Sequence, residues 1–227
     1  MANRLAIFDC DGTLVDSQAN ICRAMELCFE RAGLDRPDPT RTRRVVGLSL
    51  VEAMQAMLPG EDREAHVELA EYYKQAFHQL RREGSVDEPP YDGIPELLGS
   101  LSDHGWLLGV ATGKSDRGLN LCLEKHGLDR HFVTLQTADR HPSKPHPSMI
   151  EQAMADAGAV PETTLMIGDT SFDIKMASGA GAVGIGVSWG YHQADELLAA
   201  GAVMVADRPA DIQAFVGAFK GSNNETS

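Results

Sequence analysis

Short apolar runs alternate with helix-like segments along most of the chain. The runs are continuous, as expected of strands that are buried on both faces of a sheet. They cover residues 5–8, 107–111, 132–135, 165–167, 183–187 and 202–205. Helices are predicted over residues 116–126, 147–157 and 174–180, and a glycine follows each of them. Strands that alternate with helices predict a parallel α/β sheet.

The stretch from residue 17 to 88 has a different pattern, because it contains no convincing strand. Apolar residues recur there at helical spacing at Ile21, Met25, Cys28, Phe29 and Ala32, ahead of Gly33. Further helices are predicted over 48–58 and 64–80, a loop over 35–40, and a linker over 84–93. We therefore predict a Rossmann-like, doubly wound α/β core of residues 1–16 and 90–220. An all-helical domain of residues 17–89 interrupts this core, and residues 221–227 form a flexible tail.

Composition narrows the class of protein. The 227 residues are 43% hydrophobic, enough for a buried core, and 20 basic against 33 acidic side chains give a net charge of −13. This balance argues against a nucleic-acid or anionic-membrane binder, since phosphate backbones recruit excess lysine and arginine. No apolar run approaches the roughly 20 residues that span a bilayer, and no signal-peptide pattern is present. The four cysteines form no CxxC pair, so we expect a cytoplasmic protein with free, packed thiols.

Two carboxylates, Asp9 and Asp11, directly follow the first apolar run, beside Gly12. In open α/β sheets, ligands bind beyond the carboxyl ends of the strands. One carboxylate could attack a substrate there while the other moves the proton; a turn with solvated acids is the alternative. An EF-hand loop that starts at Asp9 is excluded, because Thr13 and Leu14 occupy the positions of a ligand and of the invariant glycine.

A second acidic pair, Asp169 and Asp173, follows the apolar run 165–167 and Gly168. Two acidic clusters at one edge of a sheet repel each other unless a cation lies between them. Mg²⁺ is the natural choice, because it is a hard ion that takes oxygen ligands and retains water. Asp173 could also cap the helix that follows, which is compatible with metal binding.

Two further segments could bind a phosphate group. Thr112 and Gly113 stand between a predicted strand and a predicted helix, where a hydroxyl and free N–H groups suit an anion; a helix cap is the alternative. The string is not a P-loop, because that motif requires glycine where Leu108 stands. Lys144 lies between prolines and could neutralise a phosphate and the crowded carboxylates, or be an ordinary surface lysine. His141 and His146 beside it are expected to be loop histidines.

In this order, the four clusters resemble the motifs of the haloacid dehalogenase superfamily of phosphohydrolases. The first motif resembles residues 9–13, the second Thr112, the third Lys144 and the fourth residues 168–173. The helical insert resembles the family's C1 cap. Residues 8–17 and 189–191 are similar to the phosphoglycolate phosphatase-like branch. Trp189 and Tyr191 themselves could line the mouth of the site, but they are expected to pack.

The resemblance implies a role for each motif residue. Asp9 would be the nucleophile that forms an aspartyl-phosphate. Asp11 would protonate the leaving group and then activate water, and its backbone carbonyl would bind Mg²⁺. Thr112, Gly113 and Lys144 would hold the phosphoryl group. The implied magnesium site comprises Asp9, Asp11, Asp169 and Asp173.

The cap is expected to select the substrate, since the core motifs contact only the phosphoryl group. The candidate residues are Arg43, Arg44, Gly47 and Ser49, in a segment that resembles the family's substrate-facing cap loop. An arginine there could pair with a second anionic group of the substrate. A solvated basic turn ahead of a helix is the alternative.

The hypothesis is a Mg²⁺-dependent phosphatase of a small phosphorylated metabolite, working as a monomer or homodimer. An aspartate at position 11 favours phosphoryl transfer over the dehalogenase and phosphonatase branches. Phosphoglycolate is the leading named substrate, with pyrophosphate, a nucleoside monophosphate or a sugar phosphate as alternatives. A phosphomutase on the same fold is a second hypothesis, although Ile21 stands where mutases tend to carry histidine. The third is a non-catalytic protein that binds a partner.

Overall fold

The computed structural model describes residues 2–219, and a six-stranded sheet lies at its centre. The strands are β1 (Asn3–Phe8), β2 (Leu107–Thr112), β3 (Phe132–Thr137), β4 (Ala159–Gly168), β5 (Val183–Val187) and β6 (Met204–Ala206). Their order is β3-β2-β1-β4-β5-β6, and every neighbouring pair is parallel. The chain thus extends the sheet to both sides of β1. The predicted doubly wound α/β class is confirmed.

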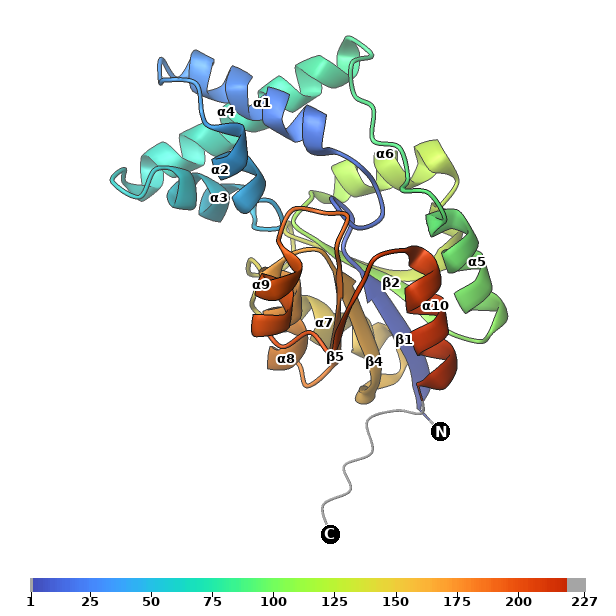
Figure 1. Cartoon of the computed structure of the whole chain (residues 1–227). Helices are drawn as coiled ribbons and strands as arrows, with labels where there is room; N and C mark the ends of the chain where they lie inside the picture. Colours follow the sequence, from blue (N-terminus) through green and yellow to red (C-terminus); the bar gives the residue numbers. More distant parts are fainter. Residues whose placement is uncertain (1, 220–227) are drawn as a thin grey trace.

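Helices cover both faces of the sheet (Figure 1). One face packs against α5 (Ile94–Asp103), α6 (Asp116–His126) and α10 (Pro209–Ala218), and the other against α7 (Ser148–Ala157) and α8 (Ser171–Gly179). The short helix α9 (Ala194–Ala199) contacts α8, β5 and β6, and a 3-10 turn, η1, spans Asp129–His131. Alternate residues of β1 pack on opposite faces of the sheet, because successive side chains of a strand point to opposite sides. Ala6 and Phe8 face one side, and Leu5 and Ile7 the other.

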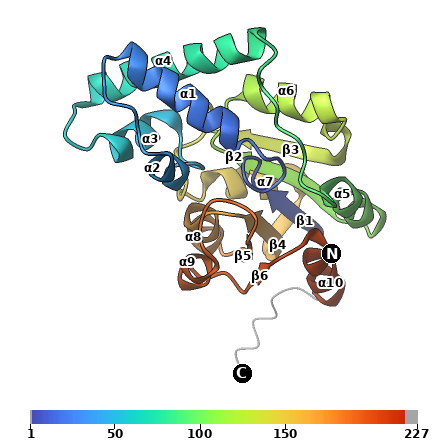
Figure 2. The same ribbon diagram turned by 45° about the horizontal axis from the view of Figure 1, so that its top comes forward.

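Four helices lie between β1 and α5 in the sequence: α1 (Gln18–Arg31), α2 (Pro39–Arg44), α3 (Leu50–Met57) and α4 (Arg63–Arg82). We call this group the cap. It has its own hydrophobic core, which includes Met25 and Phe29 of α1, Met54 of α3 and Tyr73 of α4. Figures 1 and 2 show the cap over the carboxyl end of the sheet. An all-helical insert after the first strand is present as predicted; boundaries at residues 17 and 89 stay a prediction.

Some element boundaries differ from the prediction. Residues 35–40 are not all loop, because Asp38 caps a short helix by accepting a hydrogen bond from the Thr40 N–H, with Pro39 in the first turn. Strand β6 begins at Met204 rather than at residue 202, since the buried Ala202 packs in a cluster with Leu197. The predicted tail, 221–227, lies outside the described residues. Within residues 2–219 no helix has both the length and the apolar character needed to cross a membrane.

Candidate active site

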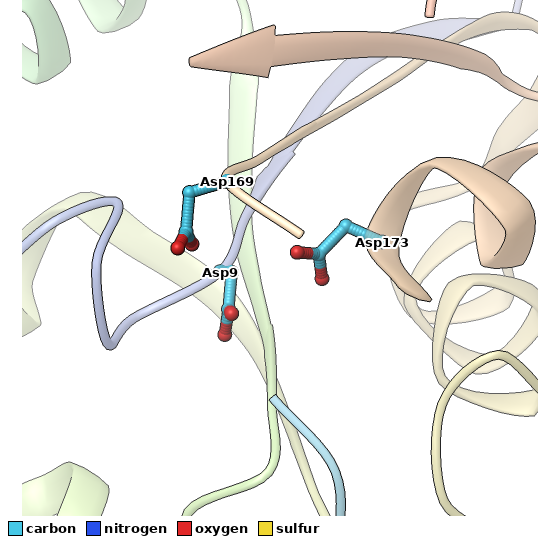
Figure 3. Close-up of side chains that lie close together, drawn as sticks. All are labelled: Asp9, Asp169 and Asp173. Carbon is cyan, nitrogen blue, oxygen red and sulfur yellow. The ribbon is translucent and has the colours of Figure 1, made fainter. Parts of the chain in front are cut away.

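Three buried carboxylates meet at the carboxyl end of the sheet. Asp9 follows β1, Asp169 follows β4 and Asp173 lies in the first turn of α8 (Figure 3). Parallel pairing places Phe8 opposite Ile167, so the segments that leave these two strands start side by side. One oxygen from each carboxylate lies within 4.8 Å of the others. The two acidic motifs thus form one cluster.

Lys144 is buried beside this cluster and forms two ion pairs. Its Nζ lies 2.9 Å from Asp9 Oδ1 and 2.6 Å from Asp173 Oδ1. The side chain is 0% exposed, so the surface-lysine alternative is wrong. Lys144 lies in the loop before α7. Its ammonium reaches the acidic cluster because this loop packs against the end of the sheet.

The remaining negative charge of the cluster is poorly compensated. The pKa of Asp9 is raised to about 7, mainly because the carboxylate is buried; the charge of Lys144 opposes this rise and that of Asp173 adds to it. Burial also raises the pKa of Asp169 well above its ordinary value, and the charge of Asp9 adds to the effect. The Oδ2 atom of Asp9 is buried and has no hydrogen-bond partner among the described residues. An all-carboxylate donor set with an unpartnered oxygen fits a small divalent cation such as Mg²⁺.

Asp173 combines the two roles that the sequence left open. Its Oδ2 accepts hydrogen bonds from the Thr170 N–H at 3.0 Å and from Thr170 Oγ1 at 2.7 Å, completing the capping box of α8. Its Oδ1 accepts from Lys144. These helix-capping hydrogen bonds hold the carboxylate toward the cluster, so Asp173 caps α8 and also belongs to the acidic site.

The carboxylate of Asp11 lies in different surroundings. Its Oδ1 accepts a hydrogen bond from Ser17 Oγ and lies 2.8 Å from Lys114 Nζ. The Tyr191 hydroxyl lies 3.2 Å from the same Ser17 oxygen. The three-carboxylate group does not include the side chain of Asp11. The resemblance implied a metal contact through the backbone carbonyl of Asp11, and not through its carboxylate. The two acids of the first motif are therefore in position for different tasks.

Lys114 and Glu88 are site residues that the sequence reasoning missed. Lys114 Nζ lies 2.8 Å from Asp11 Oδ1 and 2.7 Å from Glu88 Oε1. The Glu88 side chain is only 2% exposed. Glu88 lies in the segment that connects the cap to α5 and also pairs with Arg81 of α4 at 3.4 Å. A lysine directly after the Thr112–Gly113 motif was the available signal. No pattern in the neighbouring sequence connected this lysine to an acid in the linker, 26 residues away.

The second motif lies under a loop of the cap. Thr112 is buried at the end of β2, and its Oγ1 accepts a hydrogen bond from the Lys114 N–H at 3.2 Å. A side chain at Gly113 would meet the backbone oxygens of Gly47 and Leu48 at 2.9 and 2.7 Å. This close approach explains why glycine stands at position 113.

Of the four cap residues predicted to face the substrate, two line the cavity between cap and core and two do not. Gly47 and Ser49 are part of its wall, and the Ser49 N–H donates to Ser143 Oγ of the core at 2.9 Å. Arg44 instead forms an ion pair with Glu196 of α9 at 2.5 Å. Arg43 donates to Thr40 Oγ1 at 3.4 Å. The arginines are therefore outside the cavity wall in this structure, and their contact with substrate stays a prediction.

The aromatic pair of the 188–193 loop does more than pack. Trp189 Nε1 donates to the Thr13 carbonyl at 3.2 Å, and the Tyr191 N–H donates to Asp169 Oδ2 at 2.9 Å. This loop thus holds the first and fourth motifs together. His141 hydrogen-bonds with Ser148 and Gln136, consistent with its expected structural role.

Comparison with known proteins shows the family of the chain. The family model of haloacid dehalogenase-like hydrolases matches residues 6–187. A probable phosphatase, IndB, of Dickeya dadantii is 36% identical over 89% of each chain. A 5'-nucleotidase of Pseudomonas aeruginosa is 32% identical, over 85% of this chain and 86% of that protein. Relatives called phosphoglycolate phosphatase also match, such as that of Agrobacterium fabrum, 32% identical over 82% of this chain and 81% of its own length.

Solved structures with a similar fold include a predicted phosphatase as well. The crystal structure of a predicted phosphatase from Clostridium acetobutylicum superposes with a TM-score of 0.86 at 26% identity, covering 96% of this chain and all of that one. The match includes both the core and the cap, because it spans nearly the whole chain. With the family model matched across all four motifs, the chain belongs to the haloacid dehalogenase-like hydrolases, in the phosphatase group that includes the phosphoglycolate phosphatases.

Proposed function

We propose that the protein is a Mg²⁺-dependent phosphatase that hydrolyses a small-molecule phosphate monoester through an aspartyl-phosphate on Asp9. The observation that carries the proposal is the different surroundings of two neighbouring acids. Asp9 lies in the carboxylate cluster, with a buried oxygen that has no hydrogen-bond partner within residues 2–219. Asp11 lies outside it, between Ser17 and Lys114. A nucleophile and an acid/base need such separate environments.

The first half-reaction transfers the phosphoryl group to the enzyme. A carboxylate oxygen of Asp9 forms a bond to phosphorus, and the ester P–O bond breaks. The departing alcohol oxygen takes a proton from Asp11. Lys144 beside Asp9, and Thr112 and Gly113 at the end of β2, provide charge and hydrogen bonds for the phosphoryl oxygens.

The second half-reaction releases phosphate. Asp11, now a carboxylate, takes a proton from a water molecule as that water attacks phosphorus. The bond between phosphorus and the Asp9 oxygen breaks, which regenerates the carboxylate and yields orthophosphate. Two easier steps thus replace one difficult displacement.

Asp9, Asp169 and Asp173 are the residues that would hold Mg²⁺, together with the backbone carbonyl of Asp11 that the resemblance implies. When bound, the ion would neutralise charge on the phosphoryl oxygens and on the nucleophile. The carboxylates fit this role because each is buried in a cluster whose charge Lys144 compensates only in part. Thr13 Oγ1 donates to Asp169 Oδ1 at 2.8 Å and orients that carboxylate.

The test measures phosphate release and covalent labelling in the same preparations. Wild type, Asp9→Asn and Asp16→Asn would be incubated with phosphate esters, with Mg²⁺ or with EDTA. Asp16 is an exposed acid of the same segment, so it controls for loss of charge. We expect Mg²⁺-dependent release by wild type and Asp16→Asn, and acid-stable label from a ³²P-ester on the Asp9 peptide. We expect neither with Asp9→Asn.

Full activity of Asp9→Asn, or label on another residue, would overturn the proposed mechanism. If no ester releases phosphate, an assay of sugar-phosphate isomerisation with a bisphosphate activator distinguishes a mutase from a non-catalytic protein.

A further inference from the structure

A cavity of about 420 Å³ opens between the cap and the core, next to Asp11. Its core side includes Asp11, Gly113 and Lys114, and its other walls include α1, the loop before α3, α3, α4 and α6. Ligand-binding pockets typically have volumes of about 300–1,000 Å³. The space beside the acid/base residue is therefore large for a substrate with a two-carbon organic part.

The walls of this cavity within the cap are mainly apolar. Side chains that line it include Ile21, Met25, Val46, Val51, Tyr73 and Phe77. They come from α1, from the loop before α3, from α3 itself and from α4. Apolar surface of this kind favours an organic group that leaves water on binding.

The cationic side chains of the wall are mostly engaged by acids of the protein. Lys114, the cation nearest to Asp11, lies between Asp11 and Glu88 at 2.8 and 2.7 Å. Arg81 pairs with the same Glu88, and Lys74 pairs with Glu71 at 2.6 Å. Among the wall cations within residues 2–219, only Arg117 of α6 forms no ion pair, and it is exposed. A carboxylate one carbon from the ester oxygen would find no unpaired cation beside Asp11.

We propose that this cavity binds the alcohol part of the substrate, and that this part is an extended, largely apolar group rather than a short acid. The inference rests on the proposed phosphatase function of the same site. The ester oxygen would lie at Asp11, and the apolar group would extend between α1 and α4. The substrate class is thus a phosphate monoester of an alcohol with an aromatic or bulky aliphatic body.

The test compares esters whose leaving groups have similar chemistry. Ethyl phosphate and 2-phenylethyl phosphate are both esters of primary alcohols, so they differ mainly in the apolar group; phosphoglycolate adds the short acid. We expect kcat/KM for 2-phenylethyl phosphate to exceed that for ethyl phosphate by at least about tenfold, because a buried phenyl group gains that much from leaving water. We expect phosphoglycolate to be no better than ethyl phosphate.

A variant that fills the cavity makes the test specific. Gly118 lies in the cavity wall in the first turn of α6, and a Cβ atom added there would lie 3.3 Å from Ser115 Oγ. Gly118→Leu should remove most of the preference for 2-phenylethyl phosphate over ethyl phosphate. Gly99→Leu is the matched control, since Gly99 lies in α5, outside the cavity, with no atom near its Cβ position.

Each outcome separates the two proposals. Equal use of all three esters, better use of phosphoglycolate, or a preference that Gly118→Leu leaves intact would overturn the substrate class while leaving the phosphatase. No Mg²⁺-dependent release from any of them, or from acetyl phosphate, would instead remove the proposed function. A melting temperature for Gly118→Leu close to that of wild type shows that the cavity, and not the fold, has changed.

Discussion

At the scale of single residues, the turn that follows Asp11 brings the first motif against the fourth. Gly12 lies between Asp11 and Thr13 with φ of +84°, in the left-handed region. A Cβ atom there would overlap Asp169 Oδ2 and the ring of Tyr191. Two independent reasons therefore require glycine at position 12: the left-handed turn, and the close approach of the fourth motif.

We expect Gly12→Ala to abolish phosphatase activity and to destabilise the fold by more than the left-handed backbone alone costs. Gly127→Ala is the control, because Gly127 has φ of +64° and no atom within 4 Å of its Cβ position. The free energy of unfolding of the control should fall by only the cost of a left-handed alanine, about 1–2 kcal/mol, and its activity should be unchanged. Chemical denaturation and phosphate release measure both effects. Equal destabilisation of the two variants would contradict the overlap at Gly12.

At the scale of elements, the segment from the cap back to α5 contacts Asp11 through an intermediate lysine, Lys114. Glu88 of this segment pairs with Lys114, and Lys114 pairs with Asp11. Ser17, at the other crossing between core and cap, also hydrogen-bonds with Asp11. Both connections of the cap thus end on one carboxylate, so the position of the cap and that of the acid are coupled.

Glu88→Gln should lower kcat about tenfold for an alkyl ester and less for an aryl ester. Without Glu88, the ammonium of Lys114 has only Asp11 as a carboxylate partner, which opposes proton donation by Asp11. An alkyl leaving group depends on that proton more than an aryl one does. Asp87→Asn is the matched control, because the Asp87 side chain is 82% exposed and its ion pair is with Lys125 on the surface. An equal loss for both esters would indicate a structural role for Glu88 and contradict its positioning role.

At the scale of the whole molecule, the acidic cluster links stability to pH and to metal. Without metal, burial raises the pKa of Asp9 from 3.8 to about 7. Between those values the folded protein holds a proton that the unfolded chain has released. The free energy of unfolding therefore falls as pH rises through this range. Mg²⁺ in the cluster would replace that proton and remove the cost.

The rise in melting temperature on adding Mg²⁺ should accordingly be larger at about pH 8 than at about pH 5.5. Asp169→Asn should lose most of this rise at both pH values, since it removes one of the three carboxylates. Thermal unfolding with and without EDTA measures the effect. A rise that is independent of pH, or one that survives in Asp169→Asn, would mean that the ion binds elsewhere.

Most of the fold and the central motifs could be predicted because they depend on local pattern. Short apolar runs predicted the strands, with errors of a few residues where packing moved an end, as at Ala202. Parallel strands place their carboxyl ends at one edge, so the motifs after β1, β2 and β4 were expected to meet there. The chain order of strand, acidic motif and helical stretch was sufficient to predict an insert after the first strand.

The tertiary structure alone decided which distant side chains meet. The sequence determined, through local periodicity and motif spacing, an α/β core, a helical insert and the acids of one sheet edge. Packing of the cap on the core then placed Lys114 between Asp11 and Glu88, paired Arg44 with Glu196, and left an apolar cavity beside the acid. The physical reason is that such contacts depend on how separately formed elements pack together, and no local pattern in the chain encodes that geometry.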